Sequence, residues 1–224
     1  MRAAARSLLW ATCCGLLGIS APASATTVTV VMTGTWTSVA DTAGVLDGSV
    51  IVGGSFTATF TYDDQIADCE PFVGIGCFVM NGSSGTLSFT TGSYSFVDQG
   101  VSQNGVGLED SVQGMDIVGL FFDRFAASGP LPNGVALAPL AYANPTLTDL
   151  SETALSSDRL VEIPWDSSLW DSDFYFFGPV TGRGPQDYIE FSGTMSSITT
   201  LPEPGLGLLL ISTALLLRAV KPRQ

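Results

Sequence analysis

The chain has 224 residues with 21 acidic residues, eight basic residues, no histidine and a formal charge of −13. The absence of histidine removes the most common general base and the most common transition-metal ligand of proteins. Only three basic residues lie between residues 26 and 200 against twenty acidic ones, a formal charge of −17 that excludes nucleic acid as a partner.

Residues 1–25 have the three-part composition of a secretory signal peptide. Arg2 and Arg6 form a positive start, residues 8–19 are apolar, and Ala25 ends a small-residue cleavage site. Strand-like alternation begins immediately afterwards, so we expect cleavage after Ala25. The sequence therefore predicts an exported protein whose folded domain begins at residue 26.

Residues 26–200 are expected to form a single all-β domain, a β-sandwich of jelly-roll-like type. Between Phe56 and Tyr62 apolar residues alternate with threonines, which is typical of a strand with one buried face. Thr91-Gly92 between two such runs indicates a hairpin. Closely spaced strands without helical periodicity favour a sandwich.

The other strands and one helix are expected at less distinctive segments. The strands are expected at 28–37, 85–90, 93–97, 112–122, 135–142, 159–163, 174–177 and 188–198. A helix of one or two turns is expected at 148–157, because prolines and glycines exclude long helices elsewhere.

Cys69 and Cys77 are the two cysteines that remain after signal removal. In an oxidising compartment a close pair is most simply a disulfide that closes a small loop. A redox role is the alternative, but the spacing is not Cys-x-x-Cys and no basic residue nearby would lower a thiol pKa.

Acidic side chains gather in two segments, where extracellular β domains often bind calcium through loop carboxylates. The two clusters are Asp63, Asp64 and Asp68, and Asp166, Asp171 and Asp173. Neither has the EF-hand pattern, so we expect no cofactor, with calcium at either cluster as the alternative to solvated acidic loops.

The densest run of aromatic residues lies within 165–177. Alternation places Phe174 and Phe176 on one face of a strand, which indicates core packing for most of the rings. The alternative is a surface on which sugar rings stack, because exposed aromatic rings bind the apolar faces of sugars. That platform would consist of Trp165, Trp170 and Tyr175.

Residues 201–224 contain three ordered parts that differ from the rest of the chain. Pro202-Glu203-Pro204 is followed by an apolar span at 205–217 and by a basic end with Arg218, Lys221 and Arg223. As a helix the span would rise about 20 Å, which is short for a bilayer core of about 30 Å. The basic end is expected to stay in the cytoplasm.

This tail resembles the PEP-CTERM sorting signal of exported bacterial proteins, a motif also named after the C-terminus of ice-binding proteins. The resemblance implies that an exosortase, a membrane cysteine peptidase, recognises Pro202, Glu203 and Pro204 and removes the tail. It also implies transient residence of a short transmembrane helix in the inner membrane. The final location would be the surface or extracellular matrix of a Gram-negative bacterium that forms exopolysaccharide or biofilm.

These features together predict a non-enzymatic exported surface protein associated with exopolysaccharide. The alternative is a lectin-like carbohydrate-binding module that uses the aromatic stretch at 165–177. A glycoside hydrolase is the third hypothesis, since acidic chains contain many carboxylate pairs. No Gly-x-Ser-x-Gly motif or glycine-rich phosphate loop supports another enzyme class.

Overall fold

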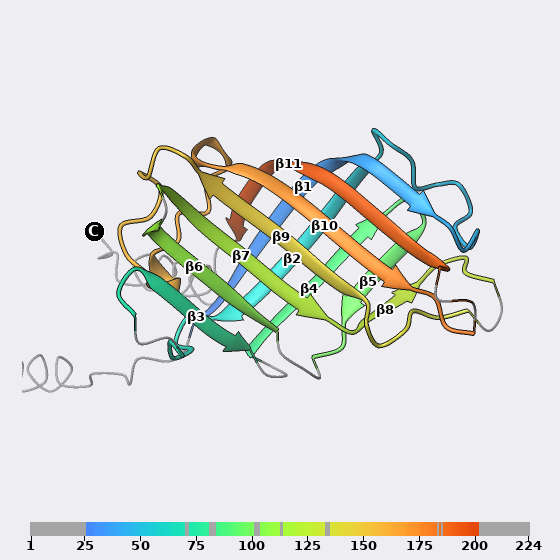
Figure 1. Ribbon diagram of the computed structural model, residues 1–224, viewed down its shortest axis with the longest axis horizontal. Coiled ribbons are helices and arrows are strands. Elements are labelled where there is room, and N and C mark those ends of the chain that lie inside the picture. The colour runs from blue at the N-terminus through green and yellow to red at the C-terminus, as the bar shows by residue number, and fades with distance from the viewer. Residues whose placement is uncertain are drawn as a thin grey trace, which may run out of the picture.

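The computed structural model describes residues 26–69, 72–80, 84–100, 104–112, 114–132, 135–182, 184 and 186–201. These residues form an all-β domain in which eleven antiparallel strands belong to a single hydrogen-bonded sheet (Figure 1). The expected signal peptide and sorting tail lie outside the described residues.

The strands are joined by connections that range from the tight turn between β4 and β5 to the long segment 150–170 between β9 and β10. They are β1 (Thr27–Asp41), β2 (Ser55–Asp63), β3 (Ile75–Met80), β4 (Gly85–Thr91), β5 (Tyr94–Asp98), β6 (Asn104–Val112), β7 (Met115–Asp123), β8 (Phe125–Ser128), β9 (Tyr142–Asp149), β10 (Asp171–Pro179) and β11 (Tyr188–Leu201). Their order in the sheet is β3-β6-β7-β9-β10-β11-β1-β2-β4-β5-β8.

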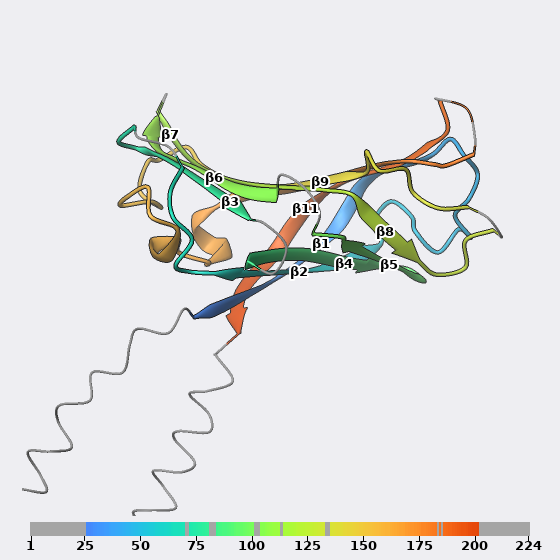
Figure 2. The same cartoon turned by 90° about the horizontal axis from the view of Figure 1, so that it is seen from below.

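The sheet curls so that its two halves face each other across one aromatic core. Figure 2 shows β6, β7 and β9 in one layer and β2, β4 and β5 in the other. The rings of Phe60 on β2 and Phe122 on β7 are 5.6 Å apart, and those of Phe96 on β5 and Phe176 on β10 are 4.9 Å apart. These strands are not neighbours in the sheet, so only the curl can bring their rings together.

The longest strands, β1 and β11, connect the two halves at the bend. Their register shifts between Thr33 and Gly34 and again between Trp36 and Ser38. Bulges of this kind bend a strand and increase its twist. A Cβ on Gly34 would lie 2.1 Å from the Thr194 carbonyl oxygen and 2.6 Å from the Phe56 ring, so the close strand approach here requires glycine.

Trp36 occupies the middle of this bend and is 1% exposed. Its ring lies 4.3 Å from that of Phe56 and 5.1 Å from that of Phe191, centroid to centroid. The indole Nε1 donates a 2.7 Å hydrogen bond to the Thr91 hydroxyl, which in turn donates to the Ser55 carbonyl oxygen at 3.1 Å. The buried indole nitrogen of Trp36 thus has a hydrogen-bond partner on β4.

Several expectations from the sequence are confirmed. The domain is all-β, and Phe56, Ala58, Phe60 and Tyr62 are buried on one face of β2. The hairpin at Gly92 joins β4 to β5, and Gly92 adopts a positive φ of 52° there.

Other expectations about single elements are wrong. The segment 135–142 contains one isolated bridge, Leu137 to Val180, instead of a strand, and 159–163 contains a 3-10 turn, Leu160–Glu162. The expected strand 112–122 is present as β7, Met115–Asp123, but no strand was expected over its hairpin partner β6, Asn104–Val112. The 3-10 turn forms because the Arg159 carbonyl oxygen accepts from the Glu162 amide at 3.0 Å.

No strand was expected over most of β9, which contains Pro145. The ladder between β7 and β9 pairs Gly119 with Thr146 and Phe122 with Ala143, and no pair forms between these two positions. The ladder with β10 is continuous and pairs Phe174 with Pro145. Since proline has no N–H to donate, the interruption toward β7 lets it lie inside a sheet.

The helix expected at 148–157 is replaced by a loop that two carboxylates hold. Asp149 accepts hydrogen bonds from the backbone N–H groups of Ser151, Thr153 and Ala154, and Asp116 accepts one from Leu155 at 2.8 Å. Glu152 has a φ of 55°, in the left-handed region, which interrupts a right-handed helix. Tertiary contacts with β7 therefore override the local helical tendency.

We expect Thr91→Val to lower the free energy of unfolding by about 1–3 kcal/mol, because the buried Trp36 Nε1 would lose its acceptor. The valine side chain has nearly the volume of threonine, so no large cavity should form. Urea unfolding measures the difference. Thr90→Val, on the exposed face of the same strand, is the matched control and should change stability by less than about 0.5 kcal/mol. Equal effects of the two substitutions would contradict the assigned role.

The hydroxyl and backbone N–H of Ser151, followed by the amides of Thr153 and Ala154, hold the pKa of Asp149 well below its usual range. A folded-state pKa below the unfolded one adds stability above the unfolded pKa of about 4, and this stability is lost as the pH falls. Asp149→Asn should therefore lower Tm most at neutral pH, and its difference from wild type should shrink in acid. Asp173→Asn, an exposed substitution, controls for the loss of one charge. A Tm difference independent of pH would contradict the linkage.

Candidate functional site

The sugar platform of Trp165, Trp170 and Tyr175 was the alternative to core packing, and the structure buries Trp170 and leaves the other two side chains partly buried. Trp170 is 6% exposed and donates its Nε1 hydrogen to the Pro164 carbonyl oxygen at 2.9 Å. Trp165 packs against the core, and its Nε1 donates to the Tyr62 hydroxyl at 3.1 Å. Both indoles precede β10 and pack toward the core, which agrees with core packing and not with an exposed platform.

Tyr175 instead belongs to a group of four aromatic side chains on the outer face of the sheet, which we call the aromatic stripe. It consists of Tyr142 on β9, Tyr175 and Phe177 on β10, and Tyr188 on β11. The ring of Tyr142 lies 5.8 Å from that of Tyr175 and 5.7 Å from that of Phe177, and the rings of Phe177 and Tyr188 are 5.2 Å apart.

The register of three strands brings the stripe together. Phe177 pairs with Tyr142 on one side and with Glu190 on the other, and Tyr175 pairs with Asn144 and Ser192. Their neighbours Phe174 and Phe176 are buried, as alternation predicted, so the stripe residues face away from the core. Tyr142 is 41% exposed, and the other three are partly buried by each other and by their neighbours.

The Tyr175 hydroxyl has an ionisation that its neighbours in the stripe alter. Its partial burial, followed by its interactions with Tyr142 and then Glu190, raises the pKa of the Tyr175 hydroxyl well above its usual value. The hydroxyl therefore stays protonated at physiological pH and is a hydrogen-bond donor. The stripe thus combines flat apolar ring faces with a donor hydroxyl and, at Glu190 and Asn144, acceptor oxygens.

The first acidic cluster is engaged by the backbone around it. Asp63 accepts from the Gln65 amide at 2.8 Å, and Asp64 accepts from the Thr26 amide at 3.1 Å. Asp68 accepts from the Cys77 amide at 2.8 Å. These carboxylates therefore stabilise turns and the strand end at β2 and β3.

The second acidic cluster is divided between a turn and a strand. Asp166 accepts from the Ser168 amide and hydroxyl, which hold the pKa of Asp166 below its usual value. Asp171 and Asp173 are exposed on β10. Among the described residues no group of three or more histidine, cysteine or acidic side chains is placed to hold a metal ion. Calcium at either cluster stays a prediction.

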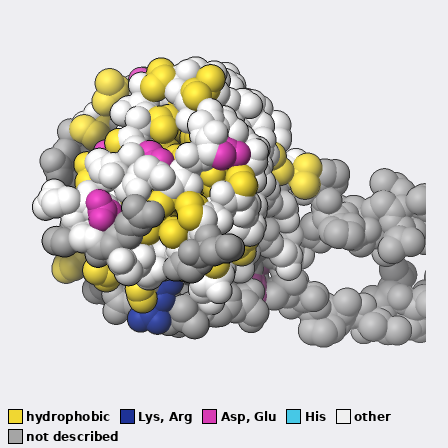
Figure 3. Space-filling model, turned by 90° about the vertical axis from the view of Figure 1, so that its right-hand side faces the viewer, with side chains coloured by type: hydrophobic (Ala, Val, Ile, Leu, Met, Phe, Trp, Pro, Cys, Tyr) yellow, Lys and Arg dark blue, Asp and Glu magenta, His cyan; other side chains and the backbone are white. Residues whose placement is uncertain are grey.

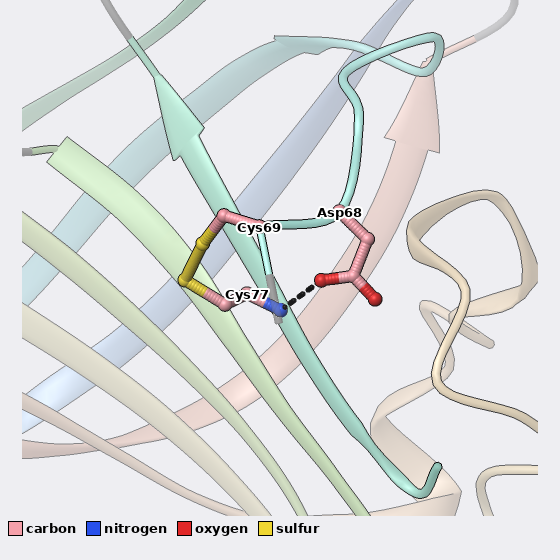
Figure 4. Close-up of a disulfide and its surroundings, with 3 residues drawn as sticks. All are labelled: Asp68, Cys69 and Cys77. Carbon is pink, nitrogen blue, oxygen red and sulfur yellow. Dashed lines mark hydrogen bonds between the residues drawn. A yellow bond between two sulfur atoms is a disulfide. The ribbon is translucent and has the colours of Figure 1, made fainter. Parts of the chain in front are cut away.

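Cys69 and Cys77 are joined by a disulfide with a Cα–Cα distance of 5.2 Å (Figure 4). The Cys69 amide also donates to the Cys77 carbonyl oxygen at 2.7 Å. Asp68 lies beside the bridge and accepts from the Cys77 amide. The disulfide therefore attaches the segment before β3 to β3 itself, which is an edge strand of the sheet.

A polar hollow of about 270 Å³ lies near the disulfide, and its lining includes Asp64, Asp68, Asp158 and Arg159. Asp158 accepts a 3.0 Å hydrogen bond from the Gly74 amide, and Arg159 forms a 2.9 Å ion pair with Glu162. The carboxylates that line the hollow thus accept hydrogen bonds from backbone N–H groups, and its arginine is paired with Glu162, which is not part of the lining.

A more apolar hollow of about 470 Å³ lies at the other end of the sheet, beside β8. Its lining includes Arg124, Phe125 and Leu137. At this end, hydrophobic side chains are mixed with uncharged polar ones, a few separate acidic groups and a basic group at the lower edge of the view (Figure 3). We see no convergent set of reactive groups on the part of this surface that the structure describes.

The sorting motif Pro202, Glu203 and Pro204 and the basic residues Arg218, Lys221 and Arg223 lie outside the described residues. Within the described part of the chain, no helix is long and apolar enough to cross a membrane. No family model, curated protein or solved structure matches this chain.

Labelling of the native protein with a thiol reagent, without reductant, should detect no free thiol at Cys69 or Cys77. Replacing both with serine should lower the free energy of unfolding by about 2–3 kcal/mol, the chain-entropy value for so short a loop. Denatured but unreduced protein is the control for buried thiols. Two labelled cysteines in that sample would contradict the bridge.

Proposed function

We propose that this chain is a non-enzymatic exported surface protein that associates with extracellular polysaccharide. The observation that carries the proposal is the aromatic stripe, an exposed sheet face on which Tyr142, Tyr175, Phe177 and Tyr188 contact one another beside Glu190 and Asn144. Aromatic rings bind the apolar faces of sugar rings, and carboxylates and amides accept hydrogen bonds from sugar hydroxyls.

Export is supported by the signal-like residues 1–25, the PEP-CTERM-like tail and the disulfide. Disulfides persist in oxidising compartments, outside the cytosol. The tail would be recognised by an exosortase-type peptidase at the inner membrane and removed, leaving the β domain at the cell surface or in the matrix.

The positions of the two ends of the domain fit this route. Thr29 near the start of β1 pairs with Leu201 at the end of β11, so both predicted sorting segments attach at one corner of the sheet. Figure 2 shows these strand ends projecting beyond β2, on the side opposite β9. A membrane-bound precursor would therefore present the aromatic stripe away from the corner at which it is attached.

The glycoside hydrolase hypothesis has less support. A hydrolase requires two carboxylates that face each other across the scissile bond. In the polar hollow, Asp68 and Asp158 accept hydrogen bonds from the backbone amides of Cys77 and Gly74, which is a structural use of these groups. The stripe contains acceptors and rings but lies on an open sheet face instead of a cleft.

The domain architecture also fits a binding role. We propose that the two facing halves of the curled sheet are equivalent to the two layers of a β-sandwich. The facing halves enclose a core as two separate sheets would, with Phe89 on β4 5.2 Å from Phe174 on β10. The continuous hydrogen bonding through β11 and β1 differs from two separate jelly-roll sheets. A rigid sandwich holds outward side chains in fixed positions, which favours recognition of an extended polymer.

The experiment is fractionation of cells that express the full chain, followed by recovery of the protein from membrane, matrix and medium. We expect the protein in the matrix fraction, with an intact mass that places its C-terminus near Pro204, and its release when the polysaccharide is digested. A variant in which alanines replace Pro202, Glu203 and Pro204 is the control and should stay with the membrane. Protein that retains Gln224 and partitions independently of polysaccharide would contradict the proposal.

A further inference from the structure

One exposed aromatic residue lies beyond the aromatic stripe and has an unusual support. Phe121 is 50% exposed on the outer face of β7, directly across from Gly105 on β6. Two more glycines, Gly107 and Gly119, pair with each other beside it. A phenylalanine at such a position is expected to cover bare backbone, because glycine exposes the sheet surface to water.

The ring of Phe121 lies down over these glycines. A Cβ on Gly119 would be 3.1 Å from both Cε2 and Cζ of Phe121, and a Cβ on Gly107 would be 3.5 Å from Cε2. Any side chain at position 119 would therefore push the ring away from the sheet. The glycines allow the outer atoms of the ring to come close to the sheet surface while half of the side chain stays exposed.

Two hollows flank this ring. One, of about 400 Å³, lies over Gly105 and Gly107 and is bounded by Val79 and Phe121. The other, of about 220 Å³, is lined by Phe121, Asp123, Tyr142 and Asn144 among others. Because Tyr142 also belongs to the aromatic stripe, the second hollow connects Phe121 to the stripe. We call Val79, Phe121 and the aromatic stripe together the outer platform.

We propose that the outer platform binds an uncharged polysaccharide of pyranose units, laid across strands β3 to β11 with Phe121 as a central stacking ring. This rests on the proposed function and names its ligand class and its surface. Exposed and half-exposed rings separated by hollows match a polymer that presents an apolar ring face at each repeat. Asp123, Asn144 and Glu190 border the rings and supply oxygens that accept from sugar hydroxyls.

The negative charge of the domain favours an uncharged polysaccharide over an acidic one. No lysine or arginine is among the residues that line the two described hollows, whereas Asp123 is. With a formal charge of −17 over residues 26–200, the domain repels acidic polysaccharides. The same charge disfavours a second copy of the chain on this face, because two acidic surfaces would meet. An uncharged glycan is not repelled by the acidic domain.

The test measures binding of the full-length protein to a soluble uncharged glucan, to galactomannan, to the anionic alginate and to matrix from the producing cells. We expect binding to the matrix and to at least one uncharged polymer, and none to alginate. Phe121→Ala should weaken binding at least about tenfold, as expected when one stacking ring is lost. Tyr142→Ala should also weaken it, and Phe121→Tyr, which keeps the ring, should not.

Phe72→Ala is the matched control, because Phe72 is a 66% exposed phenylalanine in the loop before β3 and outside the platform. It should bind as wild type does. Thermal unfolding of every variant checks that the fold is kept, and if Phe121→Ala is unfolded, Tyr142→Ala and Phe121→Tyr decide the question.

The outcomes separate the two proposals. If the wild type binds matrix but Phe121→Ala or Tyr142→Ala binds equally well, the platform is overturned while polysaccharide association stands. If the wild type prefers alginate, or if it forms a dimer that Phe121→Ala abolishes, the uncharged ligand is overturned. If the wild type binds no matrix at all, the proposed function itself fails.

Discussion

The curl of a single sheet around Trp36 is the constraint on which the rest of the molecule depends. The bulges in β1 beside Trp36 bend the sheet, and Gly34 removes the side chain that would separate the strands there. The indole then fills the bend and donates to the Thr91 hydroxyl on β4. Because the sheet folds back on itself, phenylalanines from strands far apart in the sheet meet and form one core.

The outer platform lies on the face of the sheet that points away from this core. Alternation along a strand sends every second side chain away from the core, so a core rich in phenylalanine leaves Tyr175 and Phe177 on the outside of β10. On most sheets such positions carry polar residues. Here the neighbouring strands add Tyr142 and Phe121, and the glycines beneath Phe121 let its ring lie against the sheet. The proposed ligand surface thus lies on the outer face of the sheet, where folding does not require apolar side chains.

The acidic residues have a more local role than their number suggests. Asp149 and Asp116 hold the loop after β9, Asp68 supports the strand end beside the disulfide, and Asp166 stabilises a turn. Each accepts a backbone N–H that a loop would otherwise leave without a partner in the protein. An excess of carboxylates can therefore serve a β domain whose long connections contain little regular structure.

The sequence by itself determined the strand-forming segments with clear alternation, the buried face of β2, the hairpin at Gly92 and the all-β class, because these depend on neighbours along the chain. It also predicted that Tyr175 and Phe176 lie on opposite faces. Only the tertiary structure decided that Trp165 and Trp170 turn inward, that Pro145 lies within a strand and that Tyr142 and Phe121 join Tyr175 outside. The reason is physical: alternation assigns a face to a residue, but the register between strands distant in sequence decides which side chains share it.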